Sequence, residues 1–557
     1  MEKVWLKQYP QGIPAEIDLD EFASLKDLLE RTCRRFGDLP AYRNMGVSIT
    51  YDELDRFSRD FGAFLQKVSG LTKGDRVAIM LPNLLQYPVA LFGALRAGLT
   101  VVNVNPMYTA RELQHQLADS GAKAIVVLEN FAHTLQEVLP RTRVGTVVTT
   151  RVGDLLPMLR AFFTNLVVKY VKKMVPEWRI ADTIPFRAVL KAGRERGLDD
   201  VPIAHDDVAF LQYTGGTTGM AKGAILTHRN AIANLQQLSA WFPQLEEGVE
   251  IAVMPLPLYH IYALTATFSF TKLGAQVVLI TNPRDIPALI SELKKTGFSA
   301  VIGINTLYNA LLNAPGFADV PTGRIKLACA GGMATQRAVA ERWKAATGVP
   351  IIEGLGLTET SGVVTCNPTD IEDWTGNIGV PIPSTEAAIL DDQGRELPVG
   401  EVGEIGIRGP QVMKGYWNRP DDTAMAFAPD GWFRTGDMGS MDAEGRIKIT
   451  DRRKDMIIVS GFKVFPNEVE DVVMMHPGVL EVAAIGVPDP RSGEAVKIVV
   501  VKKDPALTEA SLLEHCRKSL VAYKAPKTVE FRTEPLPKTP IGKILRRMLR
   551  TEVPVAA

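Results

Sequence analysis

The chain has 557 residues, 46% of them hydrophobic, which is enough for more than one hydrophobic core and indicates a globular protein of several domains. Its 63 basic and 63 acidic side chains cancel, and this balance excludes a global electrostatic attraction to nucleic acid. Four widely separated cysteines without C-x-x-C spacing favour neither a zinc site nor a disulfide framework, and they fit a reducing cytoplasm.

The N-terminal residues lack the basic, apolar and small-residue regions of a secretory signal, so we expect a cytoplasmic protein. The longest apolar stretch, residues 255–280, is interrupted by prolines, His260 and Lys272. These interruptions favour a buried core segment over a membrane span, and we expect no transmembrane helix.

From Thr50 the sequence alternates between helical and strand patterns. Thr50 and Glu53 have the spacing of a capping box, which opens a predicted helix with one apolar face. The predicted elements that follow are a strand at 76–81, a helix at 87–97, a strand at 100–104, a helix at 111–120, and strands at 124–128 and 144–149. A second such series runs from about 251 to 352. This alternation predicts an α/β fold of parallel sheets covered by helices.

The pattern changes after Thr375, where turns rich in Gly, Pro and Asp separate short strands at 386–390 and 403–408. They predict a small antiparallel sheet or barrel that closes a large N-terminal domain of residues 1–450. Residues 451–557 predict a smaller α/β domain with strands at 482–487 and 496–502 and a helix at 509–520.

A glycine- and threonine-rich segment, residues 213–223 (YTGGTTGMAKG), follows a predicted strand at 208–212. Glycines let the backbone close around anions, threonine hydroxyls donate hydrogen bonds and lysine adds a positive charge, so the segment predicts binding of a nucleoside triphosphate. The predicted contacts are Thr214, Gly215, Gly216, Thr217, Thr218, Gly219 and Lys222. An ordinary P-loop fails at two positions, Ala221 and Gly223. A surface turn without a ligand is the alternative for this segment taken alone.

Further segments, together with this one, resemble the acyl-adenylate-forming superfamily of acyl-CoA synthetases, luciferases and peptide-synthetase adenylation domains. The resemblance spans nearly the whole chain and depends on residues 353–361 (EGLGLTETS), 431–439 (GWFRTGDMG), 450–470 and 537–547 (PKTPIGKILRR). It implies that ATP and coenzyme A are co-substrates, with Mg²⁺ as cofactor.

The resemblance also assigns residues to the nucleotide. Thr358 would contact a phosphate oxygen and, with Glu359, would hold Mg²⁺, whose preferred ligands are oxygens. Asp437 would accept hydrogen bonds from both ribose hydroxyls, since a carboxylate suits a vicinal diol. Further assigned contacts are Gly331, Gly332, Gly354, Leu355 and Gly356. The family usually has an aromatic residue at Leu355, and the missing stacking on adenine is worth roughly 1–3 kcal/mol.

The last two segments imply a mobile C-terminal lid that turns about Asp451. Arg452 would reach the ribose, while a loop with Gly461 and Lys463 would be presented to the nucleotide or coenzyme A after the turn. Lys543 would be catalytic, because its charge offsets the repulsion between a carboxylate and the α-phosphate. A charged surface run and a basic C-terminal tail are the ordinary alternatives for these segments.

The acid substrate is indicated by His260, which matches a family segment that borders the acyl pocket and orients the carboxylate. No aspartate occurs between residues 258 and 267 to hold an amino group, so an amino acid is disfavoured. Residues 9–14, 104–108, 300–312 and 328–334 resemble bacterial long-chain fatty acyl-CoA synthetases. The predicted reaction is adenylation of a fatty acid, followed by thioester formation with coenzyme A. A medium-chain or aromatic acyl-CoA ligase and a non-catalytic lipid or nucleotide sensor are the alternatives.

Residues 151–179 carry six basic and two acidic side chains. A helical stripe beside them contains Leu155, Leu159, Phe162, Phe163, Leu166 and Tyr170. Two interpretations stay open. The segment either lies on the anionic cytoplasmic surface of the inner membrane, or it packs on its own domain or a partner chain, as in a homodimer.

Overall fold

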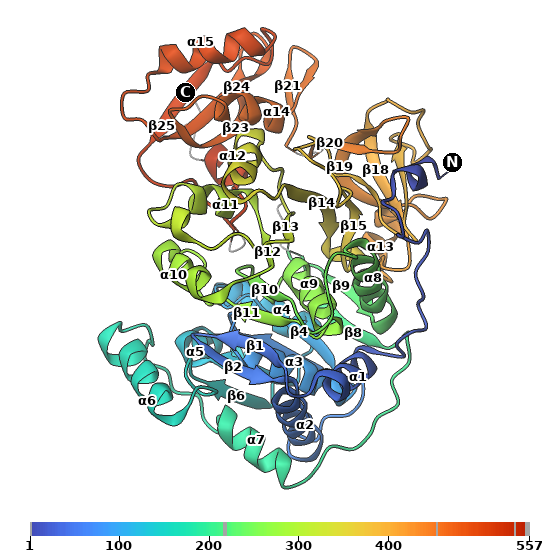
Figure 1. Ribbon diagram of the computed structural model, residues 1–557, viewed down its shortest axis with the longest axis vertical. Helices are drawn as coiled ribbons and strands as arrows, with labels where there is room; N and C mark the ends of the chain where they lie inside the picture. The colour runs from blue at the N-terminus through green and yellow to red at the C-terminus, as the bar shows by residue number, and fades with distance from the viewer. Residues whose placement is uncertain (1–2, 215–219, 453–454, 540–541, 552–557) are drawn as a thin grey trace.

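The computed structural model describes residues 3–214, 220–452, 455–539 and 542–551. In this part of the chain the strands form four sheets. Figure 1 shows two of them side by side in its upper part and the other two below, toward the lower end of the molecule. We call them the first, second, small and C-terminal sheets.

The first sheet has the order β7-β6-β5-β3-β4-β8-β9, and all its pairs are parallel except β8 with β9. Its strands are β3 (Arg76–Met80), β4 (Thr100–Asn103), β5 (Ala124–Leu128), β6 (Thr146–Thr150), β7 (Ile184–Pro185), β8 (Val208–Tyr213) and β9 (Gly223–Thr227). The helices of this region are α2 (Tyr51–Lys67), α3 (Gln86–Arg96), α4 (Ala110–Ser120), α5 (Ala132–Val138), α6 (Met158–Leu166) and α7 (Phe186–Arg194). The capping box predicted at Thr50 and Glu53 is confirmed at the start of α2.

The second sheet has the order β16-β15-β14-β13-β12-β10-β11-β1-β2, parallel in the middle and antiparallel at both ends. Its strands are β1 (Pro40–Asn44), β2 (Val47–Thr50), β10 (Ile251–Met254), β11 (Gln276–Leu279), β12 (Ala300–Gly303), β13 (Leu327–Ala330), β14 (Ile351–Leu357), β15 (Gly362–Cys366) and β16 (Val380–Pro381). The accompanying helices are α1 (Leu25–Phe36), α8 (His228–Trp241), α9 (Ile261–Lys272), α10 (Ile286–Thr296), α11 (Asn305–Leu312) and α12 (Arg337–Thr347). One continuous hydrophobic core joins this sheet to the first.

The small sheet is antiparallel and consists of β17 (Glu386–Leu390), β18 (Gly403–Arg408), β19 (Phe433–Met441) and β20 (Ile447–Arg452), with α13 (Pro420–Ala426) beside it. The C-terminal sheet consists of β21 (Ile457–Val459), β22 (Phe462–Val464), β23 (Val479–Asp489), β24 (Gly493–Lys502) and β25 (Thr528–Arg532). Three helices, α14 (Pro466–Met474), α15 (Glu509–Ser519) and α16 (Arg546–Thr551), accompany it. This unit has a hydrophobic core of its own and lies beside α11 and α12 (Figure 1).

The predicted α/β class, with a large N-terminal and a smaller C-terminal part, is confirmed. The predicted strands at 124–128, 386–390 and 403–408 have the bounds observed for β5, β17 and β18. None of the helices in the described part of the chain has the length and apolarity needed to cross a membrane. The domain boundary at residue 451 stays a prediction.

Candidate active site

A cavity of about 1710 Å³ lies between the large N-terminal part and the segment that carries Lys543. It opens where the parallel strands of the second sheet end, the usual place for ligands in α/β folds. The predicted residues that line it are Thr214, Lys222, His260, Gly331, Gly332, Gly354, Leu355, Gly356, Thr358, Glu359, Asp437 and Lys543. Segments far apart in the sequence thus converge on one site. The predicted contacts Gly215, Gly216, Thr217, Thr218 and Gly219 lie outside the described residues.

The two ends of the predicted phosphate loop, Thr214 and Lys222, lie next to one another. The Thr214 N–H donates to the Lys222 carbonyl oxygen at 2.9 Å, which closes the loop across its neck. Lys222 forms an ion pair with Asp422, and its ammonium group lies 5.2 Å from the centre of the Tyr416 ring. The lysine is therefore held at the edge of the cavity by two residues that the sequence did not single out.

Thr358 and Glu359 lie on a short 3₁₀ turn, η6 (Thr358–Thr360), which follows β14 directly. The Tyr416 hydroxyl donates to Glu359 Oε1 at 2.7 Å, and the Met413 N–H donates to the Glu359 carbonyl oxygen at 2.7 Å. The Glu359 carboxylate and the neighbouring Thr358 hydroxyl fit Mg²⁺. This ion commonly takes only one or two protein carboxylates and completes its shell with phosphate and water oxygens.

Tyr416 is the main residue that sequence reasoning missed. It connects Glu359 to Lys222 and also lines the cavity. Its backbone pairs with Ala224 next to the phosphate loop. The only signal in the sequence is an aromatic pair after Gly415 in a turn-rich stretch, which is too common a pattern to identify a site.

His260 caps the N-terminus of α9, where its Nδ1 accepts a hydrogen bond from the Tyr262 N–H at 3.3 Å. This bond places the proton of the neutral ring on Nε2. Burial, followed by the positive charge of Lys543, lowers the pKa of His260 to about 4. The imidazole is therefore uncharged at neutral pH and can donate one hydrogen bond into the cavity.

The loop that carries Lys543 contacts the N-terminal end of α11, which follows β12 of the second sheet. The Thr306 hydroxyl donates to the Gly542 carbonyl oxygen at 3.1 Å, and the Lys543 N–H donates to Thr539 Oγ1 at 3.0 Å. Gly542 has φ +87°, and a Cβ atom there would lie 2.6 Å from Ile304 Cδ1. Only glycine therefore fits this contact, which brings the ammonium of Lys543 close enough to influence His260.

The predicted nucleoside contacts lie at the border of the small sheet. Asp437 is 5% exposed on β19, and its backbone is the cross-strand partner of Arg452 on β20. Leu355 is 8% exposed and packs in the apolar cluster between β14 and the small sheet. Its side chain can cover one face of a base but supplies no ring for stacking.

Two predicted residues lie elsewhere. Gly461 forms the turn between β21 and β22, and Lys463 is exposed on β22; neither belongs to the cavity lining. The Phe462 ring between them stacks on Tyr523 with 4.8 Å between ring centres. The predicted role of this hairpin therefore requires a different pose of the C-terminal part.

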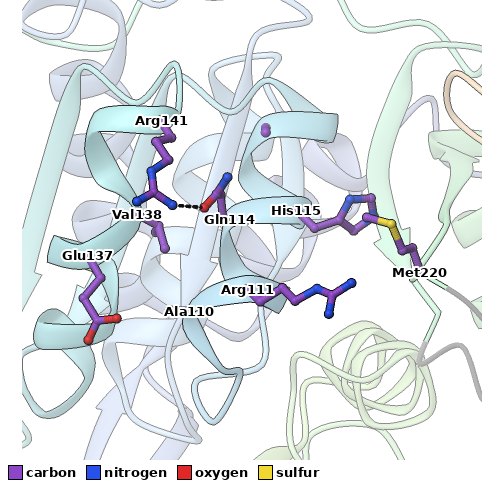
Figure 2. A pocket seen from close by; sticks show the side chains of 9 residues that line it. Ala110, Arg111, Gln114, His115, Glu137, Val138, Arg141 and Met220 are labelled. Atoms are coloured by element: carbon purple, nitrogen blue, oxygen red, sulfur yellow. Dashed lines mark hydrogen bonds between the residues drawn. The ribbon is translucent and has the colours of Figure 1, made fainter.

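A smaller cavity of about 750 Å³ adjoins the first, since Arg111, His115 and Met220 line both. Figure 2 shows its lining side chains on α4, at Glu137, Val138 and Arg141 on one side of that helix, and at Met220 on the other. His115 Nε2 donates to the Ala221 carbonyl oxygen at 2.8 Å, and Arg141 donates to Gln114 at 2.9 Å. His115 therefore fixes the end of the phosphate loop to α4.

A buried carboxyl behind the cavity makes stability depend on pH. Burial raises the pKa of Glu353 from 4.5 to about 7, although the Thr335 N–H donates to its Oε1 at 2.9 Å. The folded state keeps a proton that the unfolded state releases, so stability falls as pH rises from about 4.5 to about 7, by roughly 3 kcal/mol at most.

We expect Glu353→Gln to remove this pH-dependent contribution to stability. Unfolding midpoints of both proteins across this pH range test it, and parallel curves contradict it.

Comparison with known proteins identifies the family. Family profiles described as AMP-binding enzyme and as AMP-binding enzyme C-terminal domain match residues 29–417 and 468–543. The chain belongs to the AMP-binding enzyme family. Among its relatives, the long-chain-fatty-acid–CoA ligase of Escherichia coli O6:H1 is 55% identical over 554 residues, which cover 99% of this chain and 98% of that protein.

Solved structures show the same fold. ATP-bound MatB from Rhodopseudomonas palustris superposes with a TM-score of 0.80 at 28% identity, over 94% of this chain and 98% of that one. The anthranilate CoA ligase AuaEII, solved with anthranoyl-AMP, has a TM-score of 0.84 at 24% identity, over 96% of this chain and 98% of that one.

Proposed function

We propose that the chain is a long-chain fatty-acid–CoA ligase. ATP and coenzyme A are substrates of ligases in this family, and the full-length similarity to the E. coli ligase supports a fatty acid as the third substrate. The observation that carries the proposal is the placement of Lys543, Glu359 and His260 around one cavity. This placement provides a cation, a carboxylate suited to a metal ion and a neutral hydrogen-bond donor for the reaction between the carboxylate of the acid and the triphosphate of ATP.

In the first step a carboxylate oxygen of the acid forms a bond to the α-phosphorus, and the bond to pyrophosphate breaks. Lys543 opposes the charge repulsion between the two reactants, and the Nε2–H of His260 orients the carboxylate. Glu359 and Thr358 would hold Mg²⁺, which shields the triphosphate when bound. In the second step the thiol sulfur attacks the acyl carbon, the thiol proton is released to solvent, and AMP leaves with the electrons of the broken C–O bond.

We further propose two domains, residues 1–450 and 451–557, with a turn about Asp451 between the steps. In the present pose Lys543 lines the cavity, whereas Gly461 and Lys463 lie outside its lining. A turn of the C-terminal part would withdraw the Lys543 loop from the cavity and bring the hairpin of Gly461 and Lys463 to it. Arg452, next to the hinge, would contact the ribose. This division assigns the first step to the Lys543 loop and the second to the β21–β22 hairpin.

Pyrophosphate release across a panel of acids tests the reaction. We expect release with long-chain fatty acids, and acyl-CoA only when coenzyme A is added. A preference for medium-chain or aromatic acids would replace the substrate class, and ATP binding without any release would indicate a sensor.

We also propose that α6 and the following π-helical turn, η4 (Val167–Val171), contact an anionic membrane surface. Among the residues of α6 only Ala161 is buried. Leu159 is 74% exposed and Phe162 and Phe163 are each 61% exposed, so the part of the apolar stripe on α6 is open to solvent, whereas Leu155, before α6, packs against the core. Figure 1 shows α6 standing away from the sheets. Basic side chains beside an exposed apolar stripe fit an anionic lipid surface, where fatty acids partition.

Vesicle binding tests this contact. The double variant Phe162→Ser/Phe163→Ser should bind phosphatidylglycerol vesicles at least about tenfold more weakly, because two apolar side chains no longer enter the lipid. Met425→Ser, which changes a 70% exposed apolar residue on α13, is the matched control and should bind normally. Unchanged binding of the double variant contradicts the membrane contact, and a loss of dimer in sedimentation would assign the stripe to a second copy of the chain.

A further inference from the structure

Arg546 begins α16, three residues after Lys543, and its guanidinium group is surrounded by acceptors. Nε and Nη2 donate to the two carboxylate oxygens of Glu470 at 2.8 and 2.7 Å, and Nη2 also donates to Asn467 Oδ1 at 2.5 Å. Nη1 donates to Asp451 Oδ1 at 3.4 Å and lies 3.7 Å from Asp455 Oδ2. Every nitrogen of the guanidinium group is thus engaged within the protein, although the residue borders the cavity.

This cluster is largely shielded from solvent. The side chains of Arg546, Glu470 and Asp451 are 13%, 12% and 1% exposed. Burial raises the pKa of Glu470, and the charge of Arg546 opposes that rise. Removing one member of a buried ionic cluster leaves the others without compensation, and the planar fork of arginine is not replaced by lysine. The geometry of the cluster is therefore sensitive to small changes.

The contacts of Arg546 are of two kinds. Glu470 and Asn467 lie on α14, beyond the proposed hinge in the same part as Arg546, so these contacts can turn together with the C-terminal part. Asp451 lies on β20, which pairs with β19 in the small sheet. Its Oδ2 also accepts from the Asn467 N–H at 2.9 Å. Asp451 is thus the point where the small sheet meets the C-terminal part, and a rotation of α14 and α16 relative to β20 would change the contact between Asp451 and Arg546.

We propose that Arg546 is a positioning residue that clamps Asp451 to α14 and so holds the C-terminal part in the pose that places Lys543 in the cavity. The inference rests on the proposed two-step function, and Arg546 acts through Asp451 rather than on a substrate. Because Arg546 and Lys543 belong to one short segment, the segment that delivers the ammonium group also locks the hinge. Release of the Asp451 contact is then a condition for the second step.

Arg546→Lys and Asp451→Asn weaken this contact and should change the two half-reactions in different ways. Adenylation is followed by pyrophosphate–ATP exchange, and thioester formation is followed from supplied acyl-adenylate and coenzyme A. We expect the kcat of adenylation to fall at least about tenfold while the KM for ATP changes less than about twofold. The rate of thioester formation should stay the same or rise, because the clamped pose is less populated.

Glu470→Gln is the control, since Glu470 is hydrogen-bonded to Arg546 within the C-terminal part and the substitution leaves the Asp451 carboxylate in place. It should lower the unfolding temperature and change both half-reactions by similar factors. Equal losses in both half-reactions of Asp451→Asn, or no loss in either, would overturn the proposed role of the Asp451–Arg546 contact. If Arg546→Lys does not fold, the Asp451→Asn variant alone decides the question. Absence of pyrophosphate exchange in the unsubstituted protein would instead refute the proposed function.

Discussion

Lys543→Ala is expected to reduce adenylation about 10³-fold, while thioester formation from supplied acyl-adenylate falls less than about tenfold. The reason is the placement of the ammonium group in the cavity, where it already lowers the pKa of His260. Its loss leaves the attack of a carboxylate on a phosphate without a mobile cation. The second step joins a thiol to an acyl group whose leaving group is AMP, and it does not need this charge.

The half-reactions of Lys543→Ala are measured separately, by pyrophosphate–ATP exchange and by thioester formation. Lys518→Ala, which removes a lysine on α15 with a 70% exposed side chain, is the matched control and should leave both rates unchanged. Loss of both half-reactions in Lys543→Ala, with the control intact, would contradict the division of labour between the two steps.

Glu359→Gln is expected to lower adenylation by about 10²–10³-fold and to raise the Mg²⁺ concentration required for half-maximal rate. The substitution keeps the shape of the side chain and an acceptor for the Tyr416 hydroxyl, so the change is chiefly one of charge. A neutral amide is a poor ligand for a hard divalent cation. Mg²⁺ titration of pyrophosphate exchange gives the measurement.

Tyr416→Phe separates the charge of Glu359 from its orientation. It removes the 2.7 Å hydrogen bond but keeps the carboxylate, so we expect the adenylation rate to fall about tenfold with a nearly normal Mg²⁺ dependence.

The outcome for Glu359→Gln decides the role of the carboxylate. If that variant had the same Mg²⁺ dependence as the unsubstituted protein, Glu359 would not be a metal ligand.

Local sequence patterns predicted much of the secondary structure. The capping box at Thr50, the strand at 124–128 and the antiparallel strands at 386–390 and 403–408 are features of neighbouring residues, and the structure confirms them. The position of β1 was not predictable in this way. It pairs with β11, more than two hundred residues further along the chain, and no local pattern records that partner.

The exposed stripe on α6 shows a second limit. Spacing of apolar residues predicts which side chains share a helix face, but a face packed on protein and a face open to solvent have the same spacing. Only the arrangement of the neighbouring elements showed that Phe162 and Phe163 remain exposed.

The sequence by itself determined the α/β class and the glycine-rich phosphate loop, because strand and helix periodicity and turns depend on residues close together in the chain. The other segments at the site were implied by the resemblance of their motifs to the acyl-adenylate-forming superfamily. Tertiary structure alone decided that Tyr416 connects Lys222 to Glu359, and that Arg546 contacts Asp451 across 95 residues. Hydrogen bonds and ion pairs of this kind depend on distance and direction in space, which the order of residues does not specify.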